Sequence, residues 1–190
     1  YDGATRIACA EGIISPGLIN AHDHITFTQY PPVPHGEERY DHRHEWRKGL
    51  NGKKKLSVTQ NFYNKGETWG EIRLLLSGAT SVLGSGGEEG FLRNLDKDYL
   101  LEGLNMPAAE YDTFPLGDSS GTLSNQGCGA YGIDYGFDVA SESAYCPHVA
   151  EGINEYALNE FLCASAGVKL GRSFLKNNRS APVAREAFIR

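Results

Sequence analysis

A short apolar segment, residues 18–26 (LINAHDHIT), constrains the fold of this chain more than any other stretch. It follows a Ser-Pro-Gly turn at residues 15–17 and runs into a loop rich in proline. A run of this length between turn signals predicts a strand, and its apolar character predicts burial on both faces, as in a parallel sheet.

Further along the chain, helical and strand-like patterns alternate. Thr68 and Glu71 have the spacing of a capping box, and the residues after them predict an amphipathic helix that ends at Gly78. We then expect a buried strand at residues 79–83, a helix at residues 91–104 and an extended segment at residues 108–114. A short strand at residues 144–150 and a helix at residues 151–165 should follow. This alternation is typical of an α/β fold with parallel strands.

Composition and charge exclude several classes of function. The 190 residues are 40% hydrophobic and 22% charged, which is ordinary for a globular protein, and a net charge of −6 argues against general nucleic-acid binding. We find no apolar run of the roughly 18–20 residues that a membrane helix needs, and no secretory signal. We therefore expect a cytoplasmic protein without a nucleic-acid or membrane partner.

The four cysteines, Cys9, Cys128, Cys146 and Cys163, are scattered and form no CxxC pair. Two disulfides are the alternative, but a chain that can bury a core of this size does not need them. We expect reduced thiols.

His22 and His24 lie two residues apart in the predicted strand, so their side chains point to the same face. Two imidazoles on one face suit zinc or a similar divalent ion, although two histidines that only cap a strand end are the simpler alternative. His148 also ends a short apolar run, and Glu151 follows it by three residues. Strand ends of a parallel barrel meet on one face, so the three histidines are candidate metal ligands.

PGLINAHDHI resembles the first-strand metal motif of the amidohydrolase superfamily, whose members are metal-dependent hydrolases built on a (β/α)8 barrel of TIM type. ACAEGIIS resembles the end of the small β-sandwich domain of that family, SGATSVLGSG its second strand and PHVAEG its HxxE motif. The resemblance implies metal ligation by His22, His24 and His148, most simply of one zinc ion. The resemblance implies that Glu151 either contacts the substrate or transfers protons. It also implies that the reaction is hydrolysis of a non-peptide C–N bond in a small molecule, as in amidases and deaminases.

Other parts of the sequence depart from that family. It adds a histidine and an aspartate from later strands, whereas this chain has no histidine after His148 and no aspartate after Asp138. A complete barrel takes about 250 residues, so we expect roughly its first half. The alternative function is a truncated, non-catalytic remnant with at most weak metal binding, which could self-associate through an open barrel edge.

The expected organisation has three parts. Residues 1–15 end a small β domain, residues 16–166 form the partial barrel, and residues 167–190 form a basic tail that we expect to be disordered. The tail has six basic residues and one acid, so it carries +5 and the other 166 residues carry −11. Because the chain begins at Tyr1 and its single methionine is Met106, we expect a fragment.

His42 and His44 form a second HxH pair, which we place at the start of a helix with Asp41 as its N-cap. A solvated or half-buried helix start is the simpler interpretation. A role in the substrate pocket stays open, because loops after the first strand of such barrels often face the substrate.

Overall fold

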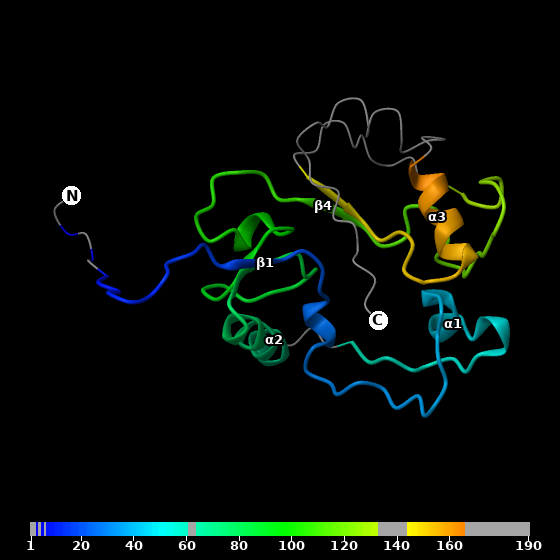
Figure 1. Cartoon of the computed structure of the whole chain (residues 1–190), viewed down its shortest axis with the longest axis horizontal. Helices are drawn as coiled ribbons and strands as arrows, with labels where there is room; N and C mark the ends of the chain where they lie inside the picture. The colour runs from blue at the N-terminus through cyan, green and yellow to red at the C-terminus, as the bar shows by residue number, and fades with distance from the viewer. Residues whose placement is uncertain (1–2, 4, 6, 61–63, 133–143, 166–190) are drawn as a thin grey trace.

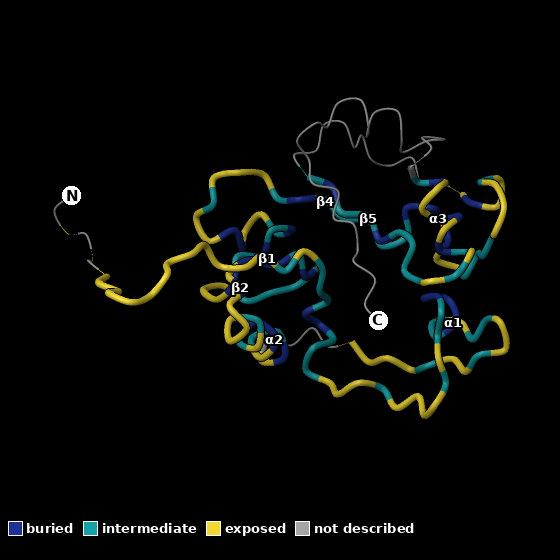
Figure 2. The backbone as a smooth tube through the Cα atoms, in the orientation of Figure 1, coloured by how far each residue is buried: buried dark blue, intermediate teal, exposed yellow. Residues whose placement is uncertain are grey.

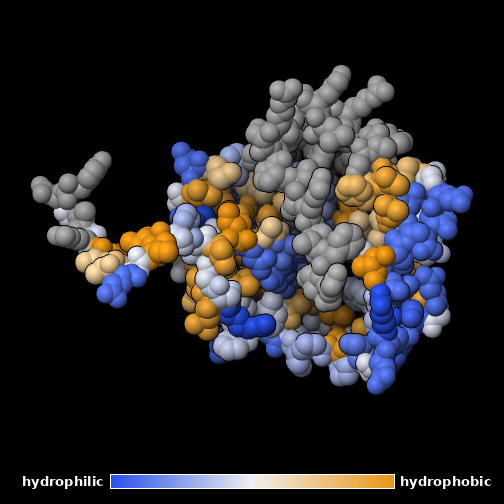
Figure 3. Space-filling model, viewed as in Figure 1, coloured by the Kyte–Doolittle hydropathy of each residue, from blue (hydrophilic) through white to orange (hydrophobic). Residues whose placement is uncertain are grey.

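The computed structural model describes residues 3, 5, 7–60, 64–132 and 144–165. The basic tail that the sequence predicts at 167–190 lies outside the described residues. Residues 7–17 run as exposed chain to the first strand (Figure 1), so their assignment to a β domain stays a prediction. Exposed isoleucines give this segment an apolar surface in Figure 3, with Ile13 96% exposed.

Short parallel strands form the centre of the fold. β1 pairs with β2 and β2 with β3 in one sheet, and β4 pairs with β5 in a second sheet. The strands are β1 (Leu18–Asn20), β2 (Ala79–Val82), β3 (Arg93–Asn94), β4 (Glu110–Asp112) and β5 (Tyr145–Pro147). The backbone N–H of Ala109 donates to Leu95 O at 2.6 Å and so links the end of β3 to the start of β4. The described residues therefore hold a three-stranded and a two-stranded parallel sheet, which this hydrogen bond joins.

Three α-helices accompany the strands: α1 (Arg43–Lys48), α2 (Asn64–Leu76) and α3 (Glu155–Ser165). α2 connects β1 to β2 and contacts both β2 and the 3-10 turn at Ile25–Phe27. As predicted, a glycine ends this crossover: Gly78 has a φ of 89° and is followed directly by β2. α1 and α3 lie on the far side of β4 and β5 from α2 (Figure 1).

The described residues thus form a mixed α/β structure with small parallel sheets, as the sequence predicts. They do not show a closed barrel, and the partial (β/α)8 barrel stays a prediction. No helix among the described residues has the length and apolar character that crossing a membrane requires.

Three local predictions are wrong. The strand expected at 18–26 is regular only to Asn20, because the side chains of Asn20 and Asp23 accept hydrogen bonds from the backbone of His22 and His24. The helix expected at 91–104 is replaced by β3 and a 3-10 turn. The capping box is absent because Thr68 lies inside α2, and the Glu71 carboxylate instead accepts hydrogen bonds from the backbone of Glu88 and Leu92.

The interior has two small apolar clusters. Ile25, Val82 and Leu92 pack between β1, β2 and α2, whereas Leu116, Tyr131 and Cys163 pack beside α3. In Figure 2 the tube is mostly buried at β2 and at the start of α1, whereas β1 is largely exposed, against the burial on both faces that the sequence predicted, and β4 is intermediate. Many buried side chains are polar or charged, among them Arg43, His44, Glu71, Asp118 and Glu160.

Cys128 and Cys163 form a disulfide, which corrects the expectation of reduced thiols; Cys9 and Cys146 are free. The paired cysteines are 35 residues apart, one in a loop and one in α3, and only the fold brings them together. Disulfides persist in oxidising compartments, so this bond does not favour the cytoplasmic location that we expected.

Candidate metal centre

Two separate segments of the backbone bring three histidines together. His22 and His24 follow β1, and His148 follows β5 directly. The segment after β1 stays aligned with the end of β2, because Asp23 N donates to Leu83 O and Ile25 N donates to Gly84 O. The i, i+2 relation therefore still places both histidines on one side, although they lie beyond the regular strand.

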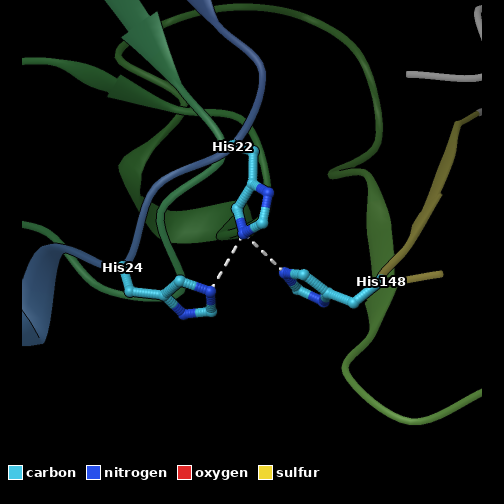
Figure 4. A group of neighbouring side chains, drawn as sticks. All are labelled: His22, His24 and His148. Atoms are coloured by element: carbon cyan, nitrogen blue, oxygen red, sulfur yellow. Dashed lines mark hydrogen bonds between the residues drawn. The ribbon is translucent and has the colours of Figure 1, made fainter. Parts of the chain in front are cut away.

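The three imidazoles point at one another (Figure 4). His22 Nε2 lies 3.0 Å from His24 Nε2 and 2.9 Å from His148 Nε2. One ring nitrogen from each histidine falls within a group whose members are all less than 4.8 Å apart. Tetrahedral zinc holds neighbouring nitrogen ligands about 3.3 Å apart, so small side-chain rotations would admit an ion of this size.

The local environment favours the neutral form of His24. His148 is buried, and His22 and His24 are half-buried. Burial, together with the nearby His148 and His22, lowers the pKa of His24, against the opposing charges of Glu151 and Asp23. A neutral imidazole has a lone pair for a metal ion, whereas a protonated imidazole does not.

The three histidines line a pocket at the carboxyl ends of the strands. The other lining residues come from β4, from β5 and from the segments that follow β1, β2 and β3: Ala21, Asp23, Leu83, Ser85, Asp96, Tyr111, Cys146 and Pro147. Asp96 is buried, and its carboxylate accepts hydrogen bonds from the backbone of Gly84 and Ser85. Burial, followed by the charge of Asp96, raises the pKa of the Cys146 thiol, which disfavours its thiolate form.

Glu151 does not line this pocket. After His148 the backbone turns through Ala150, which has a φ of 61°, and Glu151 Oε2 accepts a hydrogen bond from Arg43 Nη1 at 2.6 Å. Glu151 still acts electrostatically on His24. The structure thus brings the three predicted ligands together, whereas the predicted proton carrier Glu151 lies outside the pocket wall and is bound to Arg43.

A second cluster, His42, His44 and Glu160, is fully buried and could also hold a metal ion by proximity. Its ring nitrogens, however, already have neighbours. His42 Nδ1 accepts a hydrogen bond from His44 N, and His44 Nδ1 accepts one from Arg47. His42 Nε2 lies 2.9 Å from Glu160 Oε1, and His44 Nε2 lies 2.8 Å from Asp118 Oδ2. His42 Nε2 and Glu160 Oε1 are nevertheless buried without a well-aligned hydrogen bond among the described residues, so this cluster is a second candidate metal site.

His42 and His44 do not line the pocket beside the three histidines, so no contact supports a substrate role for them. The N-cap of α1 is His42, through its Nδ1, and not Asp41 as predicted.

The sequence gives no signal for Arg43, Asp96 or Tyr111 as neighbours of the metal centre. Each reaches the site through a contact between residues far apart in the chain. The only usable sequence signal is the position of Asp96 just after β3 and of Tyr111 within β4.

Comparison with family models, with curated proteins and with solved structures gave no match to this chain.

Proposed function

We propose that this chain binds one divalent metal ion, most simply zinc, through His22, His24 and His148, and acts as a metal-dependent hydrolase on non-peptide C–N bonds. The observation that carries the proposal is the convergence of three imidazoles from the ends of β1 and β5. His22 and His148 are 126 residues apart in the sequence, yet their rings meet. Three histidines with an open fourth position are a known ligand set of catalytic zinc.

The donor set and its surroundings fit such an ion. The lowered pKa of His24 keeps that ring available as a ligand at neutral pH. The pocket beside the histidines is also lined by Asp96 and Tyr111, which are not among the proposed metal ligands. A closed structural zinc site would instead surround the ion with four protein ligands.

The arrangement of the strands also supports the hydrolase family that the sequence resembles. β1, β2 and β3 are parallel and lie in chain order in one sheet, β4 and β5 are parallel in the second, and the three histidines follow the carboxyl ends of β1 and β5. Parallel α/β barrels place their active sites at this edge.

A zinc ion at this position would lower the pKa of a water molecule towards neutrality and polarise the bond under attack. We propose that Glu151 moves protons for this reaction. Its position supports that role, because it lies close enough to His24 to affect the pKa of the ring. The small-molecule substrate would enter the pocket past Asp96 and Tyr111.

The alternative of a non-catalytic remnant is favoured by one observation. β1 has a single partner strand among the described residues, and Leu18 and Ile19 are each 64% exposed. An exposed apolar strand edge favours pairing with another chain. Self-association through β1 is therefore part of this alternative.

Zinc content of the purified chain tests the proposal. We expect close to one zinc per chain in the wild type and none in His22→Ala/His24→Ala. His35→Ala is the matched control, because His35 is exposed and bonds only to the backbone O of Glu38; this variant should keep its zinc. Equal zinc in all three proteins, or none in the wild type, would rule out the site.

Hydrolysis then separates the two functions. With zinc bound, turnover of amides or cyclic C–N substrates that is lost in His22→Ala/His24→Ala supports the hydrolase. Zinc binding with no turnover across such a panel supports the remnant.

A further inference from the structure

Arg43 is a buried arginine in the first turn of α1, with a side chain that is only 3% exposed. Burial lowers the pKa of its guanidinium, but the charges of Asp118 and Glu151 outweigh this effect and raise it. Arg43 therefore carries a full positive charge inside the protein.

One end of this guanidinium holds the segment that carries a metal ligand. Arg43 Nη1 donates to Glu151 Oε2 at 2.6 Å and to the backbone O of Thr113, which follows β4, at 2.9 Å. The backbone O of His148 lies 3.2 Å from the same nitrogen and shares its hydrogens as the longest of the three contacts. The backbone N–H of Arg43 also donates to Glu151 O at 2.9 Å. A single residue thus contacts both ends of the turn from His148 to Glu151.

The other end of the guanidinium is anchored in the interior. Arg43 Nη2 binds Asp118 Oδ2, which also lies 2.8 Å from His44 Nε2. The guanidinium carbon lies 4.9 Å from the centre of the Phe114 ring, within the range of a cation–π contact. These contacts fix the guanidinium plane, so the position of the His148 backbone is fixed with it.

We propose that Arg43 positions His148 as a metal ligand, an inference that rests on the proposed metal centre. Groups outside the ligand set that hold a ligand in place also contribute to metal affinity. The guanidinium fork is essential to this role, because the single ammonium of a lysine cannot bind Asp118, Glu151 and the His148 carbonyl together.

Zinc affinity of Arg43→Lys tests the inference while keeping the charge. We expect affinity to fall by about 10- to 100-fold, the usual effect of losing an outer partner of a ligand. Arg39→Lys is the matched control, because Arg39 also binds an aspartate, Asp41, at 2.6 Å but is 71% exposed. That variant should bind zinc as the wild type does.

A double-mutant cycle separates positioning from general stabilisation of the fold. If Arg43 acts through His148, then Arg43→Lys should have little further effect on zinc affinity in a His148→Ala background. The absorption spectrum of bound Co²⁺ gives a second readout: Arg43→Lys and His148→Ala should change it in the same way. If Arg43→Lys does not fold, Asp118→Asn takes its place, since it loosens the anchor of Arg43.

The outcomes are distinct. Wild-type zinc affinity in Arg43→Lys, or equal losses in both backgrounds, would overturn this inference and leave the metal centre standing. A wild-type chain that binds no zinc would overturn the proposed function, and the inference with it.

Discussion

Two regions of the molecule are held together by different forces. The strand region, β1–β3 with α2 (residues 18–28 and 64–100), combines a parallel ladder with an apolar cluster of Ile25, Val82 and Leu92, and its buried Glu71 bonds to backbone N–H groups and not to a cation. The helix-pair region, α1 and α3 with residues 113–132, also has a small apolar cluster, but it adds buried ion pairs at Asp118 and a disulfide. Both regions contribute to the metal centre, since His22 and His24 follow β1 and Arg43 of α1 holds the His148 segment.

The difference has a consequence for stability. Apolar clusters lose stability gradually as methyl groups are removed, whereas a buried charge without its partner is very costly. Substitutions in the helix-pair region should therefore be more severe, and should depend more on pH, than those in the strand region.

We expect the largest effect from Asp118→Ala. It leaves Arg43 and His44 without their shared buried partner, and breaking such a pair costs about 3–5 kcal/mol in the free energy of unfolding. Urea unfolding measures the loss, and hydrogen exchange should locate it in the helix-pair region. A loss below about 1 kcal/mol, as for a surface ion pair, would contradict the inference that buried charges stabilise the helix-pair region.

The same carboxylate predicts a pH dependence. Burial alone would raise the pKa of Asp118, but the hydrogen bond from His44 and the charge of Arg43 lower it below 3.8. A group whose pKa is lowered by folding stabilises the fold above its unfolded pKa, and this contribution disappears as the pH falls through the folded pKa. The stability difference between wild type and Asp118→Ala should therefore be largest near neutrality and shrink below about pH 4.

Reduction of the Cys128–Cys163 disulfide should have an intermediate effect. A disulfide stabilises mainly by restricting the unfolded chain, typically by about 2–4 kcal/mol. Because the bond joins the loop at Cys128 to α3, exchange should rise in the helix-pair region and stay unchanged in the strand region. Uniform destabilisation of both regions would mean that they unfold as one unit.

Ile25→Val should have the smallest effect. Ile25 is fully buried against Val82 and Leu92, and removal of one methylene from such a site costs about 0.5–1.5 kcal/mol. The loss should be the same at pH 4 and pH 7, since no described neighbour in this cluster titrates. A pH-dependent loss would mean that the stability of the strand region depends on titrating groups as well, which would contradict the difference inferred between the two regions.

The sequence predicts elements of both regions where the signals are local. Apolar runs predict β2 and β5, and Gly78 marks the end of α2, because these signals act over a few residues. The helix predicted at 91–104 is wrong because Glu71, 21 residues before Leu92, binds the backbone of that residue and the side chain of Asn94. No local pattern reports a contact of this range.

The same division applies to the metal centre. His22, His24 and His148 could be predicted because the i, i+2 spacing and the strand ends are local features, and the structure brings their side chains together. Arg43 and Asp96 could not be predicted, because their contacts depend on how separate segments pack. The disulfide was missed for the same reason.

X-ray absorption at the zinc edge of the loaded chain tests the proposed ligand set. We predict nitrogen ligands at about 2.0–2.1 Å, three of them imidazoles, and one fewer imidazole in His148→Ala. Cys146 lines the same pocket and is the competing ligand. A sulfur ligand at about 2.3 Å, or an unchanged spectrum in His148→Ala, would contradict a centre built from His22, His24 and His148.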